Sequence, residues 1–335
     1  MSASNGSNPV LPGIRLAGAA SYLLINVVSL LLSIFLAVVL WKSGDLKSKR
    51  TFFIIIVQHL ISDMMSEMVQ LTLVVPATFA GYNIYEDIVL FYDLPHLIAF
   101  FDTVAYNGQL YFSFLLTINR FSVFIFPKLN VLLFTGKRVY VTIALVWFII
   151  AVFVILTNVG GCRKSFNFEK FYLWHDCVKD ISQFLWFMKM WGSYTSTYFP
   201  AIMMVMYIAL IAYTRLSNFK VFANFSWNSQ VNSKRRKREF SMLIQSFLIC
   251  VCLEIQNISF LSLPKIKDDL HIITFVQNWI VLLSSFMNPL VVFIFNGDLR
   301  TNLFMLLGVR SSKIQVAVTR FVGPSDTRSQ GTLSQ

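Results

Sequence analysis

The sequence predicts an all-α membrane protein, a seven-transmembrane helix bundle, and three observations lead to this fold class. Of the 335 residues, 56% are hydrophobic and only 13% are charged. The mean hydropathy is +0.65, which is not the composition of a soluble globular domain. Seven apolar runs are long enough to cross a bilayer, which takes about 20 residues in a helix. One membrane domain therefore accounts for nearly the whole chain.

The seven predicted spans follow one another with short polar connections. They cover residues 17–41, 52–80, 97–126, 139–159, 190–214, 240–263 and 271–295. The fifth is the least regular, because Lys189 and Pro200 interrupt its apolar run. The domain organisation predicted from these spans is an extracellular tail over 1–16 and a transmembrane domain over 17–295.

The basic residues set the expected orientation. With the N-terminus outside, 19 of the 28 Lys and Arg residues fall on the inner side and 7 on the outer side. Cytoplasmic loops carry an excess of Lys and Arg, so we expect the N-terminus outside and the C-terminus inside. The net charge of +12 is thus explained by orientation in the membrane, and nucleic acid is not an expected partner.

The two chain ends are polar and differ in kind. The outer tail contains the glycosylation sequon Asn5-Gly6-Ser7. After the last span, residues 296–307 have the pattern of a short amphipathic helix at the inner membrane surface. Residues 308–335 are polar and rich in Ser and Thr, and they predict a disordered cytoplasmic tail.

The four cysteines divide between the outer side and the membrane. Cys162 and Cys177 both fall in the second outer loop, an oxidising location, and this predicts a disulfide between them. Cys250 and Cys252 lie two residues apart in the sixth predicted span. They therefore point to different faces of that helix and are expected to be packing residues.

A segment at the inner end of the third span, from Thr117 to Pro127, reads TINRFSVFIFP. Its Asn119, Arg120 and Phe121 stand where rhodopsin-like receptors have an acidic residue, an arginine and an aromatic residue. The broader rhodopsin-like pattern is matched, in order and spacing, by Asp63, Trp147, Pro200 and Asn288-Pro289. In these residues the chain resembles G protein-coupled receptors, and the segment is most similar to nematode serpentine chemoreceptors of class X.

The resemblance implies a chemosensory receptor that binds a small molecule in the outer half of the bundle and signals to a heterotrimeric G protein. It also implies membrane lipids and arrestin as partners, the plasma membrane as location, and a sensory neuron cilium as its site. The residues assigned to G protein coupling are Asn119, Arg120, Phe121, Lys234, Arg235 and Arg236. Alternatively, Arg120 is a snorkelling anchor at the inner membrane edge, and the basic run contacts anionic lipid.

Ionisable residues inside a predicted span mark a second candidate site. Asp63 lies 12 residues beyond Thr51, about 18 Å into the membrane, where a carboxylate is costly. Glu67 is one helical turn away, and Asn288 joins the two by resemblance to the family's sodium site. Either one carboxyl is protonated, or both share a sodium ion, or they line a water-filled crevice without an ion. No other cofactor and no metal are expected.

A ligand pocket is predicted between the outer halves of the third, fifth, sixth and seventh spans. Asp102 precedes Arg120 by 18 residues, about five helical turns, which places it on the same face at the opposite membrane edge. There it meets a cationic ligand, or it forms an ion pair with Lys189, or it is a solvated helix end. The other pocket candidates are Tyr106, Trp191, Tyr194, Tyr198, Glu254, Asn257 and Trp279.

No catalytic constellation accompanies these features. The four histidines are scattered, and the sequence contains no HExxH, P-loop or GxSxG motif, so we do not expect an enzyme. The rival function is a membrane transporter or ligand-gated channel. Internal repeats or paired interrupted helices would favour a transporter, and the sequence shows neither.

Overall fold

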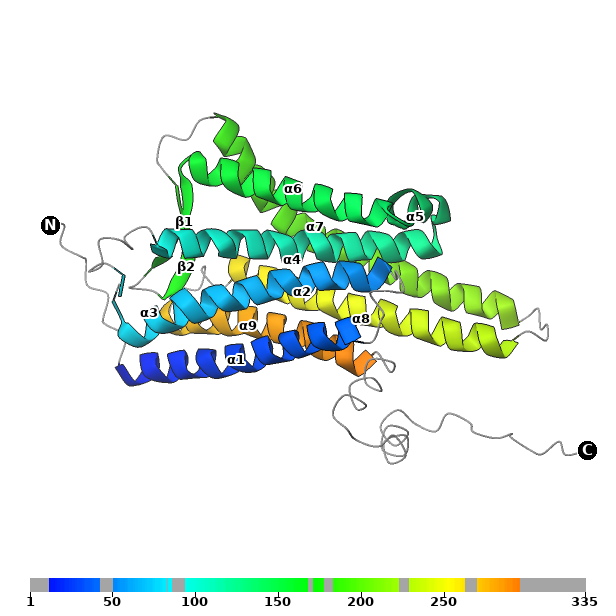
Figure 1. The fold of residues 1–335 in the computed structure, drawn as a ribbon, viewed down its shortest axis with the longest axis horizontal. Helices are drawn as coiled ribbons and strands as arrows, with labels where there is room; N and C mark the ends of the chain where they lie inside the picture. Colours follow the sequence, from blue (N-terminus) through cyan, green and yellow to red (C-terminus); the bar gives the residue numbers. More distant parts are fainter. Residues whose placement is uncertain are drawn as a thin grey trace, which may run out of the picture.

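The computed structural model describes residues 12–42, 51–82, 84–85, 94–167, 171–177, 183–222, 229–262 and 270–295. The long helices lie side by side along one axis (Figure 1). They are α1 (Pro12–Lys42), α2 (Thr51–Val69), α4 (Leu94–Phe124), α6 (Arg138–Val159), α7 (Gln183–Phe222), α8 (Ser229–Ser262) and α9 (Leu270–Phe295). The remaining elements are η1 (Gln70–Val74), α3 (Val75–Ala80), α5 (Pro127–Phe134), β1 (Cys162–Asn167) and β2 (Tyr172–Cys177).

The predicted seven-helix bundle is confirmed. The two strands lie at one end of the bundle, which we call the hairpin end (Figure 1). Helix α5 lies at the other end, which we call the α5 end (Figure 1). Helices α7 and α8 are 40 and 34 residues long, well beyond the apolar runs at 190–214 and 240–263. At 1.5 Å per residue, α7 is about 60 Å long, roughly twice the hydrocarbon thickness, so both helices continue past the membrane.

Helix α4 is the exception to the apolar pattern. By length and composition alone, six helices of the described chain can cross a membrane, and α4 is not among them. Its interior carries buried polar side chains, and it occupies the middle of the bundle between α2 and α6 (Figure 1). The buried polar residues of α4 include Asp102, Asn107, Gln109, Asn119 and Arg120.

A π-helical turn interrupts the second span. The segment η1 joins α2 to α3, and Pro76 follows it in the first turn of α3. Proline has no N–H to donate to the carbonyl four residues earlier, which is the Thr72 carbonyl. The Tyr85 hydroxyl donates to that carbonyl instead, so a side chain replaces the missing backbone bond.

The same replacement occurs in α7, which contains Pro200. The carbonyl that lacks its usual donor belongs to Ser196, and Asn257 of α8 donates its Nδ2 to it at 2.8 Å. Next to this point, the Cys250 thiol lies 3.7 Å from the Pro200 carbonyl. The proline therefore creates a polar junction between α7 and α8 at a depth where water is scarce.

Helices α2 and α4 approach closely at a glycine. A Cβ atom built on Gly108 would lie 2.2 Å from Oγ and 2.9 Å from Cβ of Ser62. The Ser62 hydroxyl donates to the Gln58 carbonyl at 3.1 Å, and the Trp147 indole of α6 donates to the Gln58 amide oxygen at 2.9 Å. Glycine is thus the residue that allows α4 to sit against α2.

The expected disulfide is confirmed. Cys162 and Cys177 are bonded to each other and form the first cross-strand pair of an antiparallel hairpin, whose last pair is Asn167 with Tyr172. Phe171, in the turn, has a φ of 55° and is buried, and its carbonyl accepts the amide of Asn278 at 2.9 Å. The hairpin therefore docks on α9.

Replacing Cys162 with Ser is expected to reduce stability by about 2–5 kcal/mol, the usual cost of losing a native disulfide. The bond closes a loop with a sequence separation of 15, and without it the two strands of the hairpin are no longer joined covalently at their open end. Surface expression measured with an epitope tag checks this, with Cys252→Ser as control because Cys252 is a free cysteine. Equal surface amounts of Cys162→Ser and wild type would contradict the expectation.

Three sequence expectations lie outside the described residues. These are the sequon at Asn5, the amphipathic helix over 296–307 and the tail over 308–335. They stay predictions.

Candidate functional site

Asp63 stands at the centre of a buried polar network on α2. Its carboxylate accepts a hydrogen bond from the Gln109 amide of α4 at 2.9 Å and from the Asn288 amide of α9 at 3.0 and 3.2 Å. His59, one turn earlier on α2, brings Nδ1 to within 3.1 Å of Oδ2 of the carboxylate. Asp63 is fully buried, so these protein groups replace the water it has lost.

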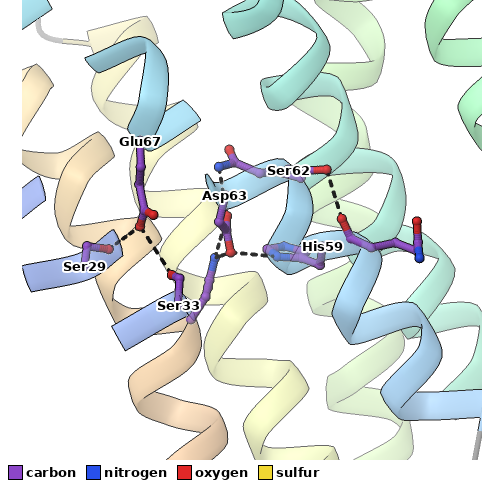
Figure 2. A network of polar contacts seen from close by, with 9 residues as sticks. Ser29, Ser33, His59, Ser62, Asp63 and Glu67 are labelled. Carbon is purple, nitrogen blue, oxygen red and sulfur yellow. Dashed lines mark hydrogen bonds and ion pairs between the residues drawn. The ribbon is translucent and has the colours of Figure 1, made fainter. Parts of the chain in front are cut away.

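Glu67 turns to a different neighbour. One of its oxygens, Oε1, accepts from the hydroxyls of Ser29 and Ser33 on α1, the latter at 3.5 Å. Its other oxygen, Oε2, is buried and has no hydrogen-bond partner among the residues that the structure describes. Figure 2 shows the separation: Glu67 points to the two serines, while Asp63 points to His59.

The resemblance implied one site shared by Asp63, Glu67 and Asn288, and the structure divides it in two. Asn288 donates its Nδ2 to Asp63. To bind a cation together with Asp63, Asn288 would have to present its side-chain oxygen, Oδ1, instead. His59 was missed as a member of this site, although its spacing of four residues from Asp63 places both on one helix face. Ser29 was also missed. It lies on another helix, so its contact with Glu67 is visible only in the folded structure.

Replacing Asp63 with Ala is expected to destabilise the protein more than Asp63→Asn. Alanine leaves the Gln109 and Asn288 amides without their acceptor, at about 1–3 kcal/mol for each buried unsatisfied group. Asparagine keeps one oxygen for these amides and removes the buried charge, so we expect it to fold like the wild type. Thermal unfolding of the purified variants checks this order, and an Asp63→Ala variant as stable as Asp63→Asn would contradict it.

At the hairpin end, Asp102 of α4 is already neutralised. Its carboxylate pairs with Lys164 of β1, and not with Lys189 as the sequence suggested. Lys164 lies opposite His175 in the hairpin register. Desolvation by the surrounding protein and then the charge of Lys164 lower the pKa of His175 to about 4, although the residue as a whole is exposed. The imidazole is therefore neutral at pH 7, and Lys164 is the cation that faces Asp102.

Tyr106 and Asn257, two of the residues predicted to line the pocket, contact each other directly. The Tyr106 hydroxyl of α4 donates to Oδ1 of Asn257 at 2.8 Å, and Asn257 in turn donates to the Ser196 carbonyl of α7. One amide thus connects α4, α7 and α8 at the point where Pro200 frees a backbone carbonyl. Glu254, one turn earlier on α8, is half-buried, and its Oε2 has no partner among the described residues.

The other predicted pocket residues lie elsewhere. Trp191, Tyr194 and Tyr198 are 46%, 50% and 55% exposed, and their spacing places them on one face of α7. The Trp279 indole donates to the Ser21 hydroxyl of α1 at 3.0 Å, so it faces α1 rather than α7. Aromatic residues at helical spacing do not reveal which face turns inward, since both lipid and core are apolar.

An apolar groove lies apart from all of these residues. It has a volume of about 460 Å³ and is lined by Ile61, Met64, Met65, Met68, Val69, Thr72, Ile98 and Phe101. These side chains come from α2, η1 and the first turns of α4. The groove includes none of the predicted pocket residues.

At the α5 end, Arg120 is buried, with 3% of its surface exposed, so it does not snorkel to the membrane edge. Its guanidinium lies over the Phe52 ring of α2, with Cζ 3.9 Å from the ring centroid. One of its nitrogens, Nη2, lies 3.3 Å from the sulfur of Met242 on α8. Arg120 therefore joins α4, α2 and α8 inside the bundle.

The neighbouring residues of the same motif differ in burial. Asn119 is buried, while Phe121 is partly buried against a cluster that includes Met203, Tyr207 and Leu243. Lys234, Arg235 and Arg236 lie within α8, and their side chains are outside the described part of the chain. Phe52 and Met242 were missed in the sequence, because apolar residues at a span end carry no signal for an arginine contact.

Comparison with known proteins covers protein families, solved structures and curated proteins. A family model described as the serpentine type 7TM GPCR chemoreceptor Srx matches residues 26–296. The crystal structure of squid rhodopsin matches with a TM-score of 0.69 and 12% sequence identity, over 96% of this chain and 90% of that chain. At this identity the match concerns the fold alone. No curated protein matches the sequence significantly.

Proposed function

Because the chain belongs to the family of Srx serpentine seven-transmembrane chemoreceptors, we propose that it binds a small molecule at the hairpin end of the bundle and signals to a heterotrimeric G protein at the α5 end. The family is one of receptors and not of enzymes. In this proposal the hairpin faces the outside and the α5 end faces the cytoplasm, as the distribution of Lys and Arg predicts.

The contacts of Arg120 carry this proposal. A permanent cation lies inside the bundle, over an aromatic ring of α2 and beside a sulfur of α8. A displacement of α8 would break the contact with Met242 and change the position of the guanidinium relative to the inner face. The arrangement thus suits a switch with two states, one closed and one open to a G protein.

The hydrogen bonds of Asn257 support a ligand site in the hairpin half of the bundle. The hydrogen bonds that connect Tyr106, Asn257 and the Ser196 carbonyl join three helices through one side-chain amide. A small molecule that competes for this amide would change how α8 is tied to α4 and α7. Because α8 is a continuous helix to its α5 end, a change at Asn257 can be passed to Met242.

The remaining partners follow from the orientation. The basic run on α8 is proposed to contact anionic lipid and the G protein at the inner membrane surface, and arrestin is proposed to share that surface. The plasma membrane is the proposed location, and the sensory neuron cilium follows from the family alone.

A ligand screen in cultured cells tests the function, with calcium or cAMP as the G protein-dependent readout. The same cell line expressing Arg120→Ala instead of the wild type is the matched control, because the loss of Arg120 should remove signalling without removing the ligand site. A response in the wild type that the control lacks supports the proposal. A ligand-evoked current that persists in both receptors, recorded under voltage clamp without G protein, would instead identify a channel.

A further inference from the structure

The two carboxylates of α2 are satisfied to different extents. Asp63 receives hydrogen bonds from Gln109 and Asn288 and lies beside the imidazole of His59. Glu67 receives two hydroxyl donors on a single oxygen, and its second oxygen has none. Since Glu67 is only 1% exposed, water does not supply the missing partner from bulk solvent.

A second unpartnered oxygen lies on the facing helix. Asn26 of α1 is fully buried and donates its Nδ2 to the Glu67 backbone carbonyl at 3.1 Å. Its Oδ1 has no hydrogen-bond partner within the described part of the chain. Two acceptors without donors thus belong to side chains that meet at the same turn of α2, and a buried acceptor left without a donor costs about 1–3 kcal/mol.

Among the described residues of the helices around it, no side chain lies in a position to neutralise Glu67. Helix α1 carries no charged residue between Arg15 and Lys42, and α9 carries none after His271. The charged residues of α4 are Asp102, already paired with Lys164, and Arg120, which lies at its α5 end. On α2, His59 is beside Asp63. Glu67 therefore faces one further carboxylate and no cation of its own.

We propose that Glu67, together with Asn26, Ser29 and Ser33, binds one monovalent cation, either Na⁺ or H⁺, at a site separate from Asp63. Carboxylate, amide and hydroxyl oxygens are hard ligands that suit such a cation. A single carboxylate balances one positive charge. No group of three or more His, Cys, Asp or Glu side chains that could hold a metal ion occurs in the described chain, which argues against a divalent ion.

The bound cation would fasten α1 to α2. Its ligands come from both helices, so any state in which the helices stay together is stabilised by mass action as the cation concentration rises. This inference goes beyond the proposed function, because it concerns the stability of the bundle and needs neither a ligand nor a G protein.

The test is the thermal unfolding of the full-length purified receptor in detergent, with sodium chloride exchanged for N-methylglucamine chloride at constant ionic strength. A second series varies the pH from 6 to 9 without sodium. We expect the midpoint of the wild type to rise by about 2–5 °C with sodium or on acidification, because the bound ion adds stability to the native state. The first series identifies Na⁺ as the bound cation, and the second identifies H⁺.

Three variants locate the site. Glu67→Gln, which keeps the shape and removes the charge, should abolish the dependence, and Asp63→Asn should keep it. If Glu67→Gln does not fold, Ser29→Ala should weaken the dependence in its place. A dependence that is lost in Asp63→Asn and retained in Glu67→Gln would overturn the proposal, and so would a wild type that responds to neither sodium nor pH.

Discussion

Replacing Arg120 with Ala is expected to lower the maximal G protein response by roughly ten- to a hundred-fold, the range of typical coupling energies, while the protein still reaches the cell surface. The guanidinium is buried between Phe52 and Met242, and we propose that it is the group exposed to the G protein in the active state. Arg120→Lys is the matched control, because it keeps the charge but not the planar guanidinium. A normal response of Arg120→Ala at normal surface expression would contradict the expectation.

Removing the aromatic partner of Arg120, in contrast, is expected to raise signalling. Phe52→Leu takes away the ring beneath the guanidinium, and a cation–π contact is worth about 0.5–2 kcal/mol, so signalling without ligand should rise by about 2- to 30-fold. Phe53→Leu is the control, because Phe53 is equally buried and packs on the Phe52 ring at 5.3 Å between centroids. Basal cAMP or calcium signals measure the difference, and equal basal signals in both variants would contradict it.

Gly108→Leu is expected to prevent the bundle from assembling. Even the Cβ atom of the new side chain would lie 2.9 Å from Cβ of Ser62, and overpacking at a helix contact usually costs about 1–3 kcal/mol or more. The branched remainder of Leu has no space to turn aside. Surface expression and detergent stability should both be lost.

A smaller change at the same position makes the test quantitative. Gly108→Ala should destabilise the protein, and Ser62→Gly in the same chain should restore part of the loss, because it removes the atoms that clash. Gly13→Ala is the control, since nothing lies within 4 Å of the Cβ atom that it adds. If Gly108→Ala were as stable as Gly13→Ala, the close contact of α2 and α4 would not limit stability.

The sequence was most informative where a pattern follows from the membrane itself. Apolar runs of sufficient length predicted the seven helices, and the outer location of Cys162 and Cys177 predicted their disulfide. The predicted spans 190–214 and 240–263 are shorter than α7 and α8. An apolar run marks the part of a helix inside the membrane, and the helix does not stop there. The orientation inferred from Lys and Arg stays a prediction.

The site was predicted in its components and not in its pairing. Asp63 with Asn288, and Tyr106 with Asn257, do come together. Lys189 of α7 was one of the alternatives for the partner of Asp102, whereas the partner comes from the hairpin, because the depth at which a loop re-enters the bundle has no signature in one sequence. For Trp191 and Trp279 the sequence predicted the helix but not which face of it is buried, since an apolar helix surface suits both lipid and protein.

The polar interior of α4 has a consequence for how the protein is made. A helix leaves the insertion channel for lipid when its own residues favour lipid, and each Asp or Arg at a helix centre costs about 2.5–3.5 kcal/mol on that scale. Helix α4 is not apolar enough by composition, but α2 is synthesised before it and already offers Asp63 to Gln109 and Ser62 to Gly108. We therefore expect α4 to enter the bilayer only with α2 beside it, so that the order of synthesis is part of what allows this bundle to form.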